Sequence, residues 1–208
     1  AALRRRIDEL LDLVKLPRTL ADRLPGGLSG GQKQRVNLAR ALAAEPDLIL
    51  CDEVTSALDT VVGAAILDLL AQLRRELGVS YMFISHDLNT VRAVCDDIVV
   101  LYAGQKVEAL GRDAFARAAR HPYFHMLATS VPELRPGWLD EVGAAQRAAL
   151  PIVTAPAQRA GLCSFLDRCP LRVAGVCDKE TPPRRQLDGG VEVFCHRSSA
   201  DLVALQKT

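Results

Sequence analysis

A serine, two glycines and a glutamine stand together near the start of the chain, in a pattern that can bind an anion. The stretch reads Leu-Ser-Gly-Gly-Gln-Lys-Gln-Arg at residues 28–35, and Ser29 is a favoured N-cap residue. Gly30 and Gly31 lack a Cβ atom, so a ligand can approach their backbone closely. The free N–H groups at a helix N-terminus attract negative charge, most naturally a phosphate. Taken alone, Ser-Gly-Gly is better explained as an ordinary capped helix.

Two carboxylates and a histidine follow short apolar runs further along the chain. Residues 47–53 read Asp-Leu-Ile-Leu-Cys-Asp-Glu, and a short run without alternation is typical of a strand buried on both faces of a parallel sheet. Ligands of such sheets bind at the carboxyl ends of the strands, where Asp52 and Glu53 fall. A second buried strand is predicted over residues 79–84, directly before a Ser-His-Asp sequence that contains His86. A solvated turn and a structural histidine are the better explanations of these residues when each is taken alone.

The elements predicted around these residues alternate between helices and strands. This order indicates an α/β layer architecture, a parallel sheet with flanking helices and a right-handed crossover. Apolar periodicity predicts helices over residues 3–16, 29–45 and 60–77, and a short one that ends near Val94. Residues 97–102 and 106–110 are predicted to form a hairpin.

The pattern changes after Gly111. Two short helices are predicted over residues 113–120 and 122–130, and residues 131–160 contain four prolines, as expected of a surface segment. Residues 161–197 have little regular pattern and contain four cysteines. We therefore expect domain boundaries after residues 27, 111 and 160, with an irregular cysteine-rich extension over residues 161–208.

Composition excludes some classes of function. The net charge is +1 and aromatic residues make up 4% of the chain, so neither a basic surface nor a base-stacking surface for nucleic acid is expected. No apolar run approaches the roughly 18–20 residues that span a bilayer. No secretory signal is recognised at the N-terminus. We therefore expect a soluble cytoplasmic protein, or a piece of one.

Four of the six cysteines lie close together near the C-terminus, and they are candidate metal ligands. Cys163, Cys169, Cys177 and Cys195 are separated by five, seven and seventeen residues. In a reducing compartment such a cluster suggests a metal more than disulfides. The spacing is looser than the paired Cys-x₂₋₄-Cys of structural zinc sites, and four thiolates also hold iron–sulfur clusters. An iron–sulfur cluster, zinc and free thiols all remain open.

Taken together, residues 28–35, 47–59 and 85–87 resemble the ATPase domain of the ATP-binding-cassette (ABC) family. The match comprises the signature Leu-Ser-Gly-Gly-Gln at residues 28–32 and a Walker B strand that ends at Asp52 and Glu53. It continues with a D-loop, Ser-Ala-Leu-Asp, at residues 56–59 and a switch histidine at His86. Four motifs in the family's order and at its spacing form a highly specific signal.

The resemblance implies roles in ATP hydrolysis. Asp52 is expected to hold Mg²⁺ through water, since hard cations prefer oxygen ligands. Glu53 is expected to orient or deprotonate the attacking water, and His86 to contact the γ-phosphate. In the family the signature closes over ATP held by the opposite subunit of a dimer, and Asp59 communicates across that interface. The signature residues expected to contact the nucleotide are Ser29, Gly30, Gly31 and Gln32.

One departure from the family pattern concerns the P-loop. The family needs Gly-x-x-x-x-Gly-Lys-Ser/Thr to hold the β- and γ-phosphates, and no Gly-Lys pair occurs in the 208 residues. The chain therefore resembles the C-terminal part of the ATPase domain, with residues 1–27 the end of its helical subdomain and residues 28–111 its core. It is expected to be a fragment of a longer protein or a degenerate subunit, and by itself to hydrolyse ATP poorly.

The C-terminal part resembles the oligopeptide and dipeptide importer branch, which includes nickel and glutathione relatives. The resemblance rests on His-Pro-Tyr at residues 121–123, on Val131-Pro132 and on the cysteine-rich tail. The Pro-Gly-Trp-Leu-Asp-Glu sequence at residues 136–141 also looks like the second half of tandem-ATPase members. Some members of this branch hold a [4Fe–4S] cluster in the tail, so the resemblance favours iron–sulfur over zinc.

The expected function is that of an ATPase subunit of an ABC importer that takes up peptides or related small solutes. Its expected partners are a second ABC ATPase, integral membrane permease subunits and, indirectly, a solute-binding protein, at the cytoplasmic face of the inner membrane. The alternative is a non-hydrolysing half-domain that completes or regulates a partner's ATP site. A soluble cassette ATPase of the DNA-repair or translation type is disfavoured by the near-neutral charge and the tail.

Overall fold

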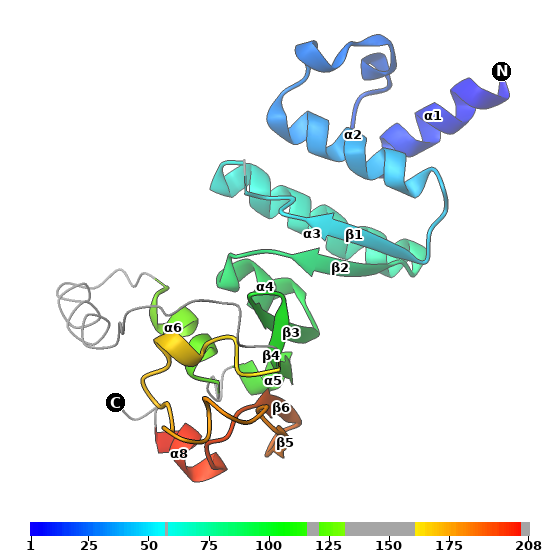
Figure 1. Cartoon of the computed structure of the whole chain (residues 1–208). Coiled ribbons are helices and arrows are strands. Elements are labelled where there is room, and N and C mark those ends of the chain that lie inside the picture. Colours follow the sequence, from blue (N-terminus) through cyan, green and yellow to red (C-terminus); the bar gives the residue numbers. More distant parts are fainter. Residues whose placement is uncertain (57, 116–120, 132–160, 205–208) are drawn as a thin grey trace. The chain divides into compact units, whose positions relative to one another are not determined.

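The computed structural model describes residues 1–56, 58–115, 121–131 and 161–204. The chain divides into two compact units, Ala1–Val94 and Cys95–Thr208 (Figure 1). The domain boundaries expected after residues 27, 111 and 160 stay predictions. The predicted helix over residues 113–120 and the surface segment over 131–160 lie largely outside the described residues.

The first unit combines helices with a small parallel sheet, as the sequence predicts. Its elements are α1 (Ala2–Leu13), η1 (Arg18–Asp22), η2 (Pro25–Gly27), α2 (Gly30–Leu42), β1 (Leu48–Asp52), α3 (Thr60–Leu77), β2 (Ser80–Ile84) and α4 (Leu88–Val94). Strands β1 and β2 pair in parallel, with Leu48 opposite Ser80 and Asp52 opposite Ile84. Helix α3 connects them and ends at Gly78, whose φ of 70° is the left-handed conformation that glycine adopts without strain.

The core of the first unit lies on one face of this sheet. Ile49 and Cys51 of β1 are buried there, among apolar side chains of α1, α2 and α3. On the opposite face Leu48 and Leu50 of β1 and Met82 and Ile84 of β2 are about half exposed or more, Leu50 to 66%. The prediction that β1 is buried on both faces is therefore wrong for the described part of the chain. A continuous apolar run does not reveal which face a neighbouring element covers.

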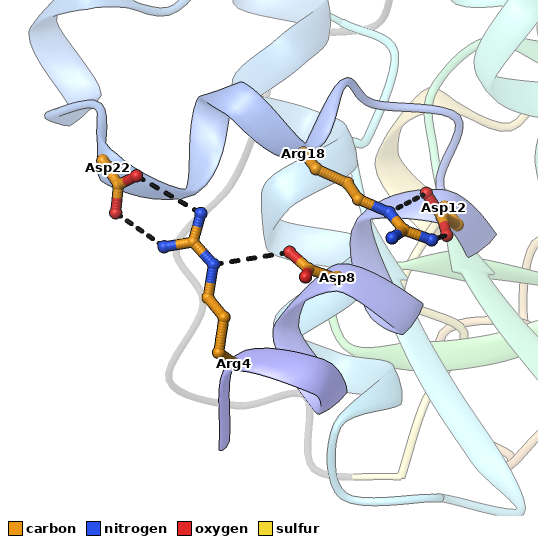
Figure 2. A network of polar contacts seen from close by, with 5 residues as sticks. All are labelled: Arg4, Asp8, Asp12, Arg18 and Asp22. Carbon is orange, nitrogen blue, oxygen red and sulfur yellow. Dashed lines mark hydrogen bonds and ion pairs between the residues drawn. The ribbon is translucent and has the colours of Figure 1, made fainter. Parts of the chain in front are cut away.

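Exposed ion pairs connect α1 to η1 (Figure 2). Arg4 donates to both carboxylate oxygens of Asp22, at 2.8 and 3.3 Å, and lies 3.5 Å from Asp8. Arg18 donates from Nε to Asp12 at 3.1 Å. The guanidinium of Arg4 holds the pKa of Asp22 below its usual range, through a hydrogen bond and charge. Because these pairs are exposed, they orient the segment and contribute little stability.

The second unit is built on an antiparallel sheet in the order β3-β4-β6-β5. Its elements are β3 (Asp97–Tyr102), β4 (Gln105–Gly111), α5 (Arg112–Phe115), α6 (Pro122–Thr129), η4 (Leu166–Arg168), β5 (Arg184–Leu187), β6 (Val191–Phe194) and α8 (Ser199–Ala204). The predicted hairpin is confirmed, and Ala103 and Gly104 form its turn with φ of 47° and 76°. Strand β6 pairs with β4 at Glu108 and Ala109.

The last two strands correct the prediction that the whole extension over 161–208 is irregular. Strands β5 and β6 form a hairpin, and Val191 and Val193 of β6 are almost completely buried. The turn contains Gly189 and Gly190, with φ of 78° and 76°, the conformation that short hairpin loops require. The signal was in the sequence as Asp-Gly-Gly between two short runs, but strands of four residues carry little periodicity.

Candidate functional site

The N-terminus of α2 is closed by a reciprocal cap between two of the predicted site residues. The Oγ atom of Ser29 accepts a hydrogen bond from the backbone N–H of Gln32 at 3.3 Å. The N–H of Ser29 donates to Oε1 of Gln32 at 3.0 Å. The prediction that Ser29 is an N-cap is confirmed, and Gln32 completes a capping box. Both side chains are thus engaged with their own helix end in this structure.

The two glycines of the same turn lie against other parts of the first unit. A Cβ atom on Gly30 would lie 3.4 Å from Cδ2 of Leu58, and one on Gly31 would lie 2.6 Å from Cγ1 of Val62. The missing Cβ atom of Gly31, which was expected to make room for a ligand, makes room for the first turn of α3 in this structure. This packing could not be predicted from the sequence, because Val62 lies 31 residues beyond Gly31. Contact of either glycine with a nucleotide stays a prediction.

The turn between β1 and α3 is held by its own polar groups. Ser56 donates from its backbone N–H and from its Oγ to the carbonyl of Glu53, at 3.1 and 3.0 Å. Asp59 caps α3, since its Oδ1 accepts the N–H of Val62 at 2.9 Å. Asp59 is thus engaged as the N-cap of α3 in this structure, and its predicted role across a dimer interface remains a prediction.

Glu53 and His86 meet at the carboxyl ends of β1 and β2. The Oε1 atom of Glu53 lies 2.9 Å from Nδ1 of His86, and both side chains are at least half exposed. The N–H of Glu53 donates to the carbonyl of Ile84 at 2.9 Å, which continues the parallel ladder past Asp52. Parallel pairing thus brings together two residues that are 33 positions apart.

The backbone at Glu53 is strained. Its φ of 46° lies in the left-handed region, which non-glycine residues rarely adopt. Such strain occurs at sites where the direction of a side chain matters. In the turn between β2 and α4, Asp87 accepts from the N–H of Asn89 at 3.0 Å and from Thr90 Oγ1 at 2.5 Å, so it holds the turn that carries His86. This role of Asp87 was not predicted, although an Asp at the start of a helix is a cap signal.

The pair of Glu53 and His86 can carry out proton transfer at the carboxyl ends of β1 and β2. A carboxylate that accepts a hydrogen bond from Nδ1 of an imidazole can orient a water molecule, while the imidazole keeps Nε2 for a second partner. Asp52, the residue before Glu53, is exposed at the same strand end and offers the hard oxygen donors that Mg²⁺ takes. These are the chemical groups that phosphoryl transfer to water uses.

The four C-terminal cysteines line one small cavity of about 20 Å³ in the second unit, which we call the cysteine cavity. The residues are Cys163, Cys169, Cys177 and Cys195, and none of them is in a disulfide. In the part of the chain that the structure describes, no three His, Cys, Asp or Glu side chains are arranged as metal ligands. The structure therefore brings the predicted cysteines together but does not form a complete ligand set.

Each sulfur of the cysteine cavity accepts a backbone N–H. The donors to Cys163, Cys169 and Cys195 are the residues two positions later in the sequence, Phe165, Leu171 and Arg197. The N–H of Val173 lies 3.4 Å from Sγ of Cys177. Burial raises the pKa of Cys169 to about 12, and these N–H groups act against that shift because they stabilise the thiolate.

No helix within the described ranges is long and apolar enough to span a membrane.

Comparisons with known proteins agree with the motifs. Residues 2–56 match the family described as ABC transporter, and residues 107–177 match the oligopeptide/dipeptide transporter C-terminal region. The chain is 42% identical over 191 residues to a putative peptide import ATP-binding protein of Brucella abortus, covering 92% of this chain and 55% of that protein. It is 36% identical over 192 residues to the oligopeptide transport ATP-binding protein AppF of Bacillus subtilis, covering 92% and 57%. The chain thus spans about half the length of the curated relatives it matches.

Solved structures show the same fold. An ATP-binding cassette of an ABC transporter in its ADP conformation, MJ1267, superimposes with a TM-score of 0.53 at 26% identity, covering 61% of this chain and 49% of that one. CbiO1 from Clostridium perfringens, part of an ABC transporter complex, superimposes with a TM-score of 0.51 at 26% identity, covering 69% and 54%. The predicted α/β fold is therefore that of an ABC cassette.

Proposed function

Because this chain belongs to the ABC transporter family, in the branch defined by the oligopeptide/dipeptide C-terminal region, we propose that it is part of an ATPase subunit that drives import of peptides or related small solutes. The observation that carries the proposal is the 2.9 Å contact between Glu53 and His86 at the ends of two parallel strands. ATP and Mg²⁺ are the ligands that this activity requires.

Glu53 is the proposed general base. Its carboxylate would orient the attacking water and take its proton, and the hydrogen bond from His86 would fix the direction of that carboxylate. In its doubly protonated form His86 would donate from Nδ1 to Glu53 and from Nε2 to the γ-phosphate, where it would stabilise the charge that develops. Asp52 would hold Mg²⁺ through water, and the bound metal would supply charge neutralisation on the phosphates.

The signature residues are proposed to act on a nucleotide held by a second ATPase subunit or domain. Support comes from the position of Ser29 and Gly30 at the exposed N-terminus of a 13-residue helix, where the helix dipole favours phosphate. Asp59 lies in the neighbouring turn and would contact the same partner. No P-loop occurs in the 208 residues, so the proposal assigns phosphate binding by that motif to a segment or subunit outside them.

The proposed assembly is a dimer of ATPase subunits bound to integral membrane permeases at the cytoplasmic face, with a solute-binding protein as an indirect partner. The printed names of the relatives, peptide import and oligopeptide transport ATP-binding proteins, support the peptide assignment. The alternative, a half-domain that completes a partner's site without hydrolysing ATP, requires the same signature helix but not Glu53.

The variant Glu53→Gln in the intact transporter tests the proposed base. We expect ATP binding to be retained and hydrolysis to fall by about 100-fold or more, because the amide cannot take a proton. The matched control is Glu45→Gln, since Glu45 is also exposed and also has a positive φ of 49°, but contacts Arg6 instead of His86. Unchanged hydrolysis in Glu53→Gln would remove Glu53 as the base and favour the half-domain.

The cysteine cavity is a second proposed functional site, for a [4Fe–4S] cluster or zinc. The observation that favours it is the set of backbone N–H groups on all four sulfurs, because thiolates bound to a metal carry charge that such donors stabilise. Four thiolates are the ligand number that zinc and [4Fe–4S] clusters take, and binding would have to bring the four sulfurs into a complete ligand set, which the described residues do not form. The bound group would supply structural stability or redox sensing. Cys169→Ser should lose the metal found in the natural protein by elemental analysis, while Cys95→Ser should retain it; equal metal content in both variants would exclude the four-cysteine site.

A further inference from the structure

His121 is a buried histidine, with one hydrogen bond that holds its ring and another that holds its backbone. Its Nδ1 accepts the N–H of Tyr123 at 3.1 Å, so the histidine serves as the N-cap of α6. Its backbone N–H donates to Oε2 of Glu108 at 2.6 Å, and Glu108 is completely buried in β4. Since Nδ1 accepts a hydrogen bond and burial lowers the pKa of His121 to about 4, the ring is neutral and its proton is on Nε2.

Aromatic rings hold this histidine beside the cysteine loop. The ring of Phe165, which follows Cys163 by two residues, lies 6.0 Å from the imidazole of His121 in an edge-on arrangement. Tyr102 and Tyr123 pack on the same phenylalanine at 5.1 and 5.4 Å between ring centroids. The His-Pro-Tyr segment and the first cysteine are therefore parts of one packed cluster.

The imidazole of His121 lines the cysteine cavity together with the four sulfurs. Nδ1 is occupied by α6, and so Nε2–H is the one donor that the ring can offer to that cavity. His196 lines the same cavity but differs, because its Nε2 lies 3.1 Å from the carbonyl of Glu180. Of these two histidines, only His121 is buried and has its Nδ1, rather than its Nε2, in a hydrogen bond with the backbone.

We propose that His121 is a positioning residue of the cysteine cavity, whose Nε2–H donates a hydrogen bond to the thiolates of a bound metal centre. This inference rests on the metal centre proposed above. The donor adds to the backbone N–H groups on the sulfurs, spreads the thiolate charge and slows loss of the metal. The proposal also explains the His-Pro-Tyr motif. Its first residue caps α6 through Nδ1 and donates to the cysteine thiolates through Nε2–H.

Two substitutions separate the two ring nitrogens. In His121→Asn the side-chain oxygen can replace Nδ1, because Asn is a good N-cap, but no donor reaches the position of Nε2. In His121→Gln the longer amide can replace the Nε2 donor, whereas the cap is lost. His196→Asn is the matched control on the same cavity.

The experiment uses the full chain, reconstituted without oxygen with ferric iron, sulfide and a thiol reductant, and in parallel with zinc alone. Metal per chain, the rate of metal loss to a chelator and the energy of the sulfur-to-metal absorption band are measured. We expect His121→Asn to lose metal about 10- to 100-fold faster than the unsubstituted chain and to shift the band, as loss of an outer hydrogen bond does. His121→Gln and His196→Asn should behave like the unsubstituted chain.

Each other result overturns the proposal. If His121→Asn matches the unsubstituted chain, the Nε2 donor has no role. If both His121 variants, or His121→Gln alone, lose metal faster, the effect comes from the cap and packing of α6. If the unsubstituted chain binds neither iron–sulfur nor zinc, the metal centre itself fails, and that outcome is distinguished by metal content before any variant is compared.

Discussion

Gly31 of α2 and Val62 of α3 are in such close contact that a Cβ atom on the glycine would lie 2.6 Å from Cγ1 of the valine. The neighbouring Gly30 approaches Leu58 in the turn before α3. The signature helix and the segment that begins with the D-loop are therefore packed directly on each other. A shift of either one must be transmitted to the other, because the contact leaves no space between them.

Gly31→Ala should destabilise the chain. The added methyl group overlaps Val62, a β-branched side chain with little freedom at χ1, so we expect a loss of about 1–3 kcal/mol in the free energy of unfolding. Gly27→Ala is the control, since no atom lies within 4 Å of its Cβ position. In a chain that already carries Val62→Ala, the further substitution Gly31→Ala should cost little stability, because the overlapping methyl group of the valine is gone. Denaturant titration of the unsubstituted chain, the three single variants and the double variant measures these differences. An equal cost of Gly31→Ala with and without Val62 would contradict the overlap.

His86→Ala should reduce ATP hydrolysis in the intact transporter by about 100-fold or more, with little effect on ATP binding. The reason is that His86 both orients Glu53 and faces the γ-phosphate in the proposed site. The double variant with Glu53→Gln should be little slower than either single variant, since residues that act as a unit are not additive. Hydrolysis rates of the three variants test this, and fully multiplicative losses would show that the two side chains act independently.

Lowering the pH should destabilise the second unit through His121. Burial lowers the pKa of its imidazole to about 4 in the folded chain, against about 6.5 when unfolded, so the unfolded state binds more protons between these values. The stabilisation is complete above pH 6.5 and is lost as the pH falls towards 4, by roughly 2 kcal/mol at pH 5.

Unfolding free energies of the chain and of His121→Asn at pH 7.5 and pH 5 measure this effect. His121→Asn should show a clearly smaller pH dependence, and the part that persists includes half-buried His125, whose pKa is also lowered by burial. Equal pH dependence in the two proteins would show that His121 is not the titrating group.

The turn between β3 and β4 should respond in opposite directions to two neighbouring substitutions. Ala103 has a φ of 47°, so Ala103→Gly relieves strain and should stabilise the chain by up to about 1 kcal/mol. Gly104 has a φ of 76° with open space around it, so Gly104→Ala adds strain alone and should destabilise by about 1 kcal/mol. Thermal unfolding of both variants tests the turn; a shift of the same sign in both would contradict its conformation.

The sequence predicted the parts of this protein that depend on neighbours in the chain. The α-helices α1, α2 and α3 were predicted to within three residues at each end, and Ser29, Asp59 and Gly78 mark ends of the last two. The meeting of Glu53 and His86 was also foreseeable, since parallel strands end at one edge. These features follow from local propensity and strand order.

The parts that the sequence did not predict depend on contacts between distant residues. Gly31 could not be assigned to Val62, and the exposed face of β1 could not be told from a buried one. His121 is held by Glu108, thirteen residues earlier in the sequence, and by Phe165, forty-four residues later. The hydrogen-bond partners of a buried histidine become visible only in three dimensions.

The apolar side of β1 and β2 has a practical consequence for the measurements above. Leu48, Leu50, Met82 and Ile84 lie exposed on neighbouring strands, and we expect a fluorescent dye such as ANS to bind them in the folded chain. In a dye-based melting assay the fluorescence would then be high before unfolding begins, and the folded protein would be misinterpreted as a molten globule. Far-ultraviolet circular dichroism follows the helices directly and gives the unfolding curve without that error.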